Sequence, residues 1–189
     1  MSAASQSEPF RVEEATIADL HAAIKAGRTT CADVVRQYIA RARAFNGVGG
    51  YIRFKSKLDP RLRELAILQI GWLEKSEYEF THHVKIGKEF GVTDEDITAL
   101  MAETEGVQSS LEPLARAILK GAREMARDLE MSMTTFAEIK RQLSDEQMVD
   151  LVLTIAHYCA VVRVLATMKI DNEPHYKEVL EQYPIPGVS

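Results

Sequence analysis

The sequence predicts an all-α protein in which short loops connect amphipathic helices. Helix-capping signals recur directly before runs of apolar residues with helical spacing, and no segment shows the alternation of a convincing β-strand. The segments between the expected helices are short, which favours antiparallel neighbours packed as a bundle.

The expected helices begin at recognisable caps. A Ser or Thr followed three residues later by Asp, Glu or Gln fits a capping box, and pairs of this kind include Thr16 with Asp19, Thr30 with Asp33, Thr135 with Glu138, and Ser144 with Gln147. Asp59 before Pro60 fits an N-cap with proline at the first helical position, and Gly91 fits a helix end. We therefore expect helices over residues 16–26, 31–45, 60–74, 76–90, 94–104, 111–129, 134–142 and 145–169, and a short one near 174–182.

A glycine-rich passage divides the chain. Residues 46–51 read NGVGGY, a composition typical of a joint between two structural parts. We expect an N-terminal helical extension over residues 1–50, folded as a helical hairpin, and a main domain over residues 51–189.

Composition narrows the class of protein. The 189 residues are 46% hydrophobic and 27% charged, which is enough for one sizeable core. A formal net charge of −5 without a basic face argues against a nucleic-acid partner. No apolar run approaches the roughly 20 residues of a membrane span and the N-terminus is polar, so we expect a cytoplasmic protein without a membrane partner. The two cysteines, Cys31 and Cys159, have neither disulfide-motif nor metal-ligand spacing.

The segment 75–91, KSEYEFTHHVKIGKEFG, carries the strongest chemical signal. On a helix, Ser76, Glu79 and His83 lie along one face, while His82 points about 100° away around the helix. Glu64 lies on the preceding expected helix and could reach the same place. A carboxylate one turn from an imidazole is a plausible acid/base pair.

These residues carry a resemblance to a known family. RLRELAIL, then EYEF followed by His83, then GVTDEDI, and later IAHYCAVVRVLATMKID, together resemble the carboxymuconolactone decarboxylase family. The likeness runs from about residue 51 to 172 and implies the all-α, AhpD-like bundle that this family shares with alkylhydroperoxidase D. It also implies assembly as a homotrimer or homohexamer, and a reaction that requires no cofactor.

The resemblance also implies roles for individual residues. The redox branch of the family has the motif C-x-x-C-x-x-x-H, and here Ser76 and Glu79 stand at the cysteine positions with His83 at the histidine. Glu64 stands where that branch has the glutamate of its proton relay. Because both thiols are absent, the resemblance favours decarboxylase chemistry over peroxidase chemistry.

A second resemblance concerns residues 1–48, which are similar to the lead-in helices of amidase-signature enzymes. The glycine- and serine-rich segment and the catalytic lysine of those enzymes have no counterpart in this chain, so amidase activity is not implied. We expect this segment to dock on the bundle or on a neighbouring subunit.

The sequence therefore predicts catalytic roles for His83, Glu79 and Glu64, and substrate-binding roles for Ser76, Arg63 and Trp72. Structural alternatives remain open: Ser76 could only cap a helix, Glu64 could pair with Arg61 or Lys75, and Trp72 could only pack. An arginine should bind the substrate carboxylate, and both Arg61 and Arg63 qualify. Glu64, Glu79 and His83 could in principle ligate a metal, but Glu-x-x-x-His occurs once and lacks the paired Glu-x-x-His of di-iron bundles, so we expect no metal.

The expected activity is decarboxylation of a small carboxylated lactone of the γ-carboxymuconolactone type by His/Glu acid-base chemistry. Two alternatives remain: a non-catalytic scaffold or binding protein with the same fold, and a thiol-dependent peroxidase. A pocket closed around Glu79 and His83 would favour the scaffold, whereas an open polar cavity would favour an enzyme.

Overall fold

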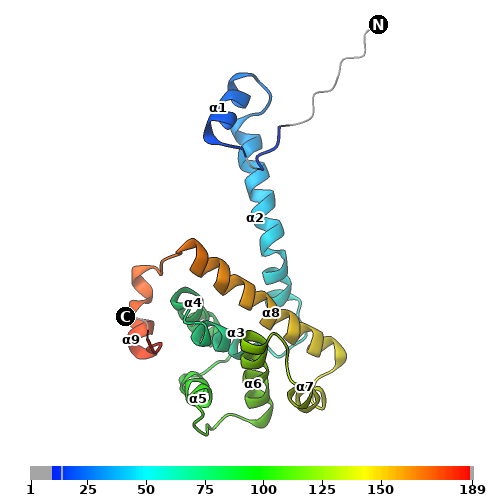
Figure 1. Cartoon of the computed structure of the whole chain (residues 1–189), viewed down its shortest axis with the longest axis vertical. Helices are drawn as coiled ribbons and strands as arrows, with labels where there is room; N and C mark the ends of the chain where they lie inside the picture. The colour runs from blue at the N-terminus through cyan, green and yellow to red at the C-terminus, as the bar shows by residue number, and fades with distance from the viewer. Residues whose placement is uncertain (1–9, 14, 188–189) are drawn as a thin grey trace. The chain divides into compact units, whose positions relative to one another are not determined.

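The computed structural model describes residues 10–13 and 15–187, and over these residues it contains helices and no strand (Figure 1). The all-α prediction is confirmed. The helices are α1 (Ile17–Lys25), α2 (Cys31–Phe54), α3 (Pro60–Leu73), α4 (Glu77–Glu89), α5 (Asp94–Thr104), α6 (Pro113–Asp128), α7 (Met133–Lys140), α8 (Asp145–Met168), the short 3₁₀ helix η1 (Pro174–Tyr176) and α9 (Lys177–Gln182).

The chain forms two compact units, residues 1–50 and residues 51–189. In the first unit, Thr16 and Asp19 form a complete capping box at the start of α1. Gln37 ties the segment before α1 to α2, because its side chain accepts a hydrogen bond from Val12 N and donates one to Phe10 O.

Helix α2 is longer than the sequence suggested. It continues from Cys31 to Phe54, so the expected end at residue 45 is wrong, and the glycine-rich residues 46–51, where the two units divide, are helical. The glycines of this passage have no positive φ angle, and a glycine inside a helix costs only about 1 kcal/mol relative to alanine.

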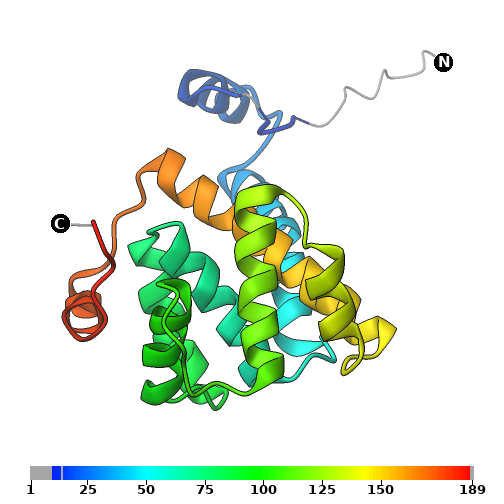
Figure 2. The same ribbon diagram turned by 60° about the horizontal axis from the view of Figure 1, so that its bottom comes forward.

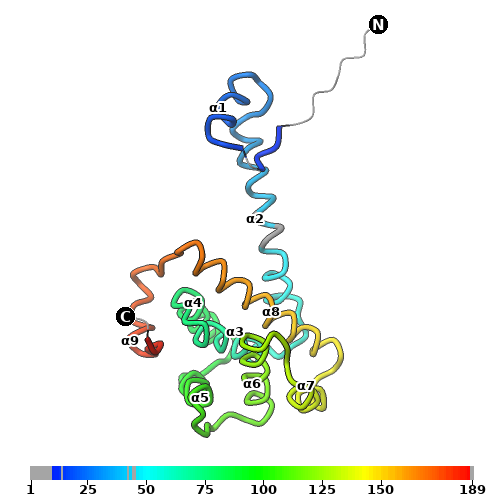
Figure 3. The backbone as a smooth tube through the Cα atoms, in the orientation of Figure 1, coloured from blue at the N-terminus to red at the C-terminus, as the bar shows by residue number. Residues whose placement is uncertain are grey.

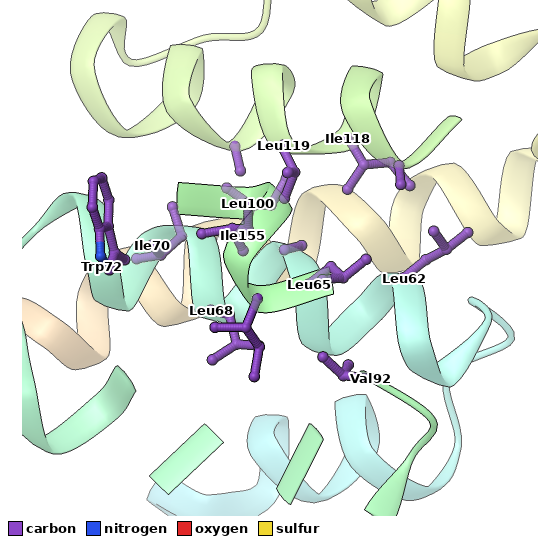
Figure 4. Packing of buried hydrophobic residues seen from close by; sticks show 14 of the residues in the cluster. Leu62, Leu65, Leu68, Ile70, Trp72, Val92, Leu100, Ile118, Leu119 and Ile155 are labelled. Atoms are coloured by element: carbon purple, nitrogen blue, oxygen red, sulfur yellow. The ribbon is translucent and has the colours of Figure 1, made fainter. Parts of the chain in front are cut away.

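In the second unit, α3 is the central helix and packs against α4, α5, α6 and α8 (Figure 2). Every residue of α3 from Leu62 to Trp72 is buried. Figure 4 shows Leu65 and Ile70 of α3 among Leu100 of α5, Leu119 of α6 and Ile155 of α8. A helix surrounded on all sides must bury its polar residues too, which is why Arg63 and Glu64 lie inside the bundle.

Most of the predicted helix starts in this unit are confirmed. Asp59 caps α3 by accepting a hydrogen bond from Leu62 N, and Ser144 forms the predicted capping box at α8. The predicted start at Thr135 is wrong, because Ser132 caps α7 and Thr135 is buried inside it.

Buried Asp150 of α8 anchors the chain that enters α3. Its carboxylate accepts hydrogen bonds from Tyr51 Oη at 2.8 Å, Ser56 Oγ at 3.1 Å and Lys57 N at 2.6 Å. The end of α2 and the turn that follows it are thereby fixed against the bundle.

Helix α8 corrects the expectation that no apolar stretch of the sequence approaches the length of a membrane span. Among the described residues it is the one helix long and apolar enough to cross a membrane by length and composition, with a mean hydropathy of 1.8 over its most apolar 18-residue window. Only 22% of that window is buried, so α8 presents a second apolar face besides the one that packs on α3. Counting consecutive apolar residues missed this helix because Asp150 and Arg163 interrupt the run.

The chain after α8 turns back towards α4, as the trace in Figure 3 shows, and α9 packs on α4. Asn172 Nδ2 donates to Thr81 Oγ1 at 3.0 Å, and the ring of His82 stacks between those of Tyr78 and Tyr176, each at 4.0 Å. His82 therefore holds the C-terminal segment and does not share the surroundings of His83.

Candidate active site

The candidate site is centred on His83, whose two ring nitrogens each face a carboxylate. Nδ1 lies 2.7 Å from Glu64 Oε2 of α3, and Nε2 lies 3.0 Å from Glu79 Oε1, one turn earlier on α4. The structure thus brings together the three residues for which the sequence predicts catalytic roles.

A glycine of α3 permits the close approach of α3 and α4 at this contact, and a glycine of α4 lies at a tight contact nearby. A Cβ atom on Gly71 of α3 would lie 3.0 Å from the backbone nitrogen of Phe80. A Cβ atom on Gly87 of α4 would lie 3.2 Å from Val92 Cγ2 and 3.5 Å from Glu64 Cβ. The absence of a side chain at Gly71 lets the two helices that carry Glu64 and His83 approach each other closely.

The three groups are almost completely buried: Glu64 is 1% exposed, Glu79 5% and His83 8%. Burial by itself would lower the pKa of His83, but the hydrogen bonds to Glu64 and Glu79 outweigh it and raise the pKa to about 9. Burial raises the pKa of Glu64, but its hydrogen bond and charge interaction with His83 and the charge of Arg63 bring the net change below the ordinary value. At neutral pH the site therefore holds His83 as an imidazolium, with Glu64 and Glu79 at its two ring nitrogens.

Arg63 completes this buried charge cluster. Its Nε and Nη2 donate to Glu64 Oε1 at 3.1 and 2.9 Å, and its Nη1 donates to the carbonyl of Arg53 at 3.3 Å. The guanidinium also lies over the ring of Phe90, 4.6 Å from the centroid, and the residue is 2% exposed. Its hydrogen-bond donors face protein acceptors, so this geometry assigns Arg63 to holding Glu64 in place.

Helix α8 contributes Tyr158, a residue to which no site role was assigned from the sequence. The ring of Tyr158 meets the ring of His83 edge to face, with centroids 5.0 Å apart. Burial raises the pKa of Tyr158, and the charges of Glu79 and Glu64 raise it further. Tyr158 therefore remains a neutral phenol beside the imidazolium. In the sequence, Tyr158 was marked only by its place in IAHYCAVVRVLATMKID, the last stretch that resembles the family.

Comparison with known proteins finds a similarity to one family in the segment that contains this site. The model of the carboxymuconolactone decarboxylase family matches residues 40–123, which include all of α3 and α4 and therefore Glu64, Glu79 and His83. Over these residues the chain is similar to the carboxymuconolactone decarboxylase family. No curated protein matches the chain.

A solved structure supports the fold of this chain. It is a protein of unknown function from Agrobacterium tumefaciens, provisionally described as the antioxidant defence protein AhpD. The two chains are 18% identical, the match covers 70% of this chain and 90% of the other, and the TM-score is 0.62. The AhpD-like bundle predicted from the sequence is confirmed, whereas the likeness of residues 1–48 to amidase lead-in helices gains no support.

The other two predicted substrate-binding residues lie apart from His83. Ser76 begins α4 and lines a cavity of about 420 Å³ between the α3–α4 turn and the end of α8. Trp72 is buried in the core, and its indole Nε1 has no hydrogen-bond partner in the described part of the chain. Over residues 10–13 and 15–187, no hydrogen bond, ion pair or ring contact joins either residue to His83.

Metal and thiol chemistry have little basis in the described residues. Residues 10–13 and 15–187 contain no group of three or more His, Cys, Asp or Glu side chains arranged to hold a metal ion. Cys31 and Cys159 are not disulfide-bonded, and burial raises the pKa of the Cys159 thiol. Neither cysteine occupies the motif positions of Ser76 and Glu79.

Proposed function

We propose that this protein is a cofactor-free decarboxylase acting on a small carboxylated lactone of the γ-carboxymuconolactone type. The observation that supports this most is the imidazolium of His83, held by hydrogen bonds to two buried carboxylates. A protonated imidazole of this kind can act as a general acid and supply a proton to a substrate carbon, and it needs neither a metal nor a thiol to do so.

In this reaction the bond between the substrate carbon and its carboxylate breaks, and the electron pair delocalises into the conjugated lactone as carbon dioxide leaves. A proton must then be delivered to carbon, and water restores it to the protein afterwards. Because Glu64 and Glu79 occupy both nitrogens of His83, we infer that the proton leaves through Glu79, whose Oε1 lies 3.0 Å from Nε2. Glu64, fixed by Arg63, keeps the ring oriented.

The thiol-dependent alternative receives little support. An AhpD-type peroxidase needs two neighbouring thiols, and Ser76 and Glu79 stand at their positions. The description of the Agrobacterium protein as an antioxidant defence protein therefore does not carry over to this chain by way of the motif.

One observation favours the non-catalytic alternative. The side chains of His83 and Glu79 are only 10% and 7% exposed, so a substrate must displace the groups that cover them. A scaffold or binding protein that kept the buried charge cluster for stability would show the same closure, and only an activity measurement separates the two functions.

The test is release of carbon dioxide from γ-carboxymuconolactone by the purified full-length protein. We expect turnover by the wild type and a loss of about 100-fold or more in Glu79→Gln and His83→Ala, in line with the usual contribution of general acid-base catalysis. Glu89→Gln is the matched control, because Glu89 is an exposed carboxylate at the end of the same helix and should leave turnover unchanged.

Circular dichroism must show that each variant stays folded. Absence of turnover in the folded wild type would exclude this reaction and favour the scaffold. Turnover that survives in both site variants would exclude the assigned proton route.

A further inference from the structure

Two arginines considered from the sequence are already paired within the protein. Arg61 forms ion pairs with Asp96 and Glu112, and Arg63 is bound to Glu64. A substrate carboxylate could reach either guanidinium only by displacing a protein carboxylate that already holds it. An anion-binding group near His83 must therefore be a cation that has no such partner.

Arg53, in the last turn of α2, lies in the same unit and beside the same cluster. Its carbonyl accepts the hydrogen bond from Arg63, and the guanidinium groups of both arginines lie over the ring of Phe90, at 5.8 and 4.6 Å from its centroid. The positive charge of Arg53 also acts on Tyr158, where it opposes the effect of Glu79 and Glu64 on the phenol pKa. Arg53 thus lies beside Arg63, at the edge of the buried charge cluster.

The guanidinium groups of Arg61 and Arg63 each have a carboxylate partner, whereas that of Arg53 has none among the described residues. Among the described residues it makes no ion pair, and its Nε is buried without a hydrogen-bond acceptor. A buried donor without an acceptor is costly, and the cost is greater for a charged group. The side chain as a whole is half-buried, so its outer nitrogens remain within reach of a ligand.

We propose that Arg53 binds a carboxylate of the small acid on which the His83 site acts, namely the carboxylate that remains in the product. The inference rests on the proposed decarboxylase function and adds the group that recognises the substrate. Pairing with the departing carboxylate would stabilise the ground state and slow the reaction, whereas pairing with the retained carboxylate anchors the substrate through every step. A guanidinium suits this task because it can bind a carboxylate through two parallel hydrogen bonds.

The surroundings of Arg53 favour a planar, unsaturated acid. Its guanidinium lies 5.6 Å from the ring centroid of Phe54, which is 77% exposed, as well as over Phe90. Exposed aromatic surface beside an unpaired cation provides a flat apolar contact for a ring and an ionic contact for its carboxylate.

The experiment compares two ligands of nearly the same shape, 2-furoate and its uncharged amide, 2-furamide, in NMR titrations of the full-length protein. We expect the wild type to bind 2-furoate about 10-fold or more tighter than 2-furamide, as charge-assisted hydrogen bonds require. Arg53→Gln should abolish this preference. Lys55→Gln, which removes an exposed cation two residues away, should retain it.

The outcomes separate this inference from the proposed reaction. A preference for 2-furoate that persists in Arg53→Gln, or that the wild type lacks, overturns the role of Arg53 whether or not the protein releases carbon dioxide. A preference lost only in Arg53→Gln supports that role, even if γ-carboxymuconolactone is not turned over and the named reaction fails. Where turnover is measurable, Arg53→Gln should raise KM more than it lowers kcat.

Discussion

At the scale of single residues, the charge of His83 depends on its two carboxylate partners. An imidazole buried alone would lose its proton more easily than in water, because burial disfavours the charged form. Glu64 and Glu79 reverse this and raise the pKa of His83 to about 9. Arg63 keeps Glu64 from becoming an unbalanced buried charge.

This arrangement predicts a specific dependence of stability on pH. The folded pKa of His83, about 9, lies above the ordinary value of 6.5, so its contribution is fully present below about pH 6.5 and is lost as the pH rises through about 9. We expect the free energy of unfolding of the wild type to fall between pH 7 and 10 by on the order of 1–3 kcal/mol from this group. Urea unfolding at a series of pH values measures it.

His83→Gln should unfold with a much smaller change over the same pH range, since the titrating group is gone. His21→Gln is the control, because His21 is an exposed histidine outside the second unit and should leave the wild-type dependence unchanged. Equal slopes in the wild type and His83→Gln would show that the imidazolium does not contribute as assigned.

At the scale of helices, the site depends on how closely α3 and α4 pack. Their contact needs Gly71 in particular, because a Cβ atom there would lie 3.0 Å from the nitrogen and 3.1 Å from the Cα of Phe80. Backbone atoms cannot move aside as a flexible side chain can.

We therefore expect Gly71→Ala to destabilise the protein by about 1–3 kcal/mol, the usual cost of overpacking, despite the higher helix propensity of alanine. Gly47→Ala is the matched control: Gly47 also lies in a helix, but no described atom would lie within 4 Å of its Cβ. That variant should be more stable by about 0.5–1 kcal/mol. Thermal unfolding compares the two, and a stabilised Gly71→Ala would contradict the close packing.

The helices also show what could be predicted from sequence. Local signals such as Asp59–Pro60 and the Ser144 box identified helix starts because a cap depends on only a few adjacent residues. The meeting of Glu64 with His83 could be anticipated because the two residues lie on consecutive helices. Arg53 and Tyr158 could not be anticipated as neighbours of the site, since their places depend on how distant helices pack. The early end predicted for α2 also put Arg53 outside any helix.

At the scale of the whole molecule, the second unit presents an apolar face that the described chain does not cover. A groove of about 610 Å³ between α7 and α8 is lined by residues that include Phe136, Val149 and Leu153, and Val149 is 66% exposed. Exposed apolar surface of this kind on a helix is typical of an interface with another protein surface. The assembly into trimers or hexamers that the family resemblance implies would cover it with a second copy.

We therefore expect the purified protein to be oligomeric in light-scattering measurements coupled to size-exclusion chromatography. Val149→Lys should shift it towards the monomer, because a charge buried in an apolar interface without a partner is strongly unfavourable. Val107→Lys is the control: Val107 is 57% exposed in the segment between α5 and α6, away from the groove-lining residues, and the same change there should leave the assembly intact. A monomeric wild type, or an unchanged mass for Val149→Lys, would mean that copies of this chain do not associate through this face.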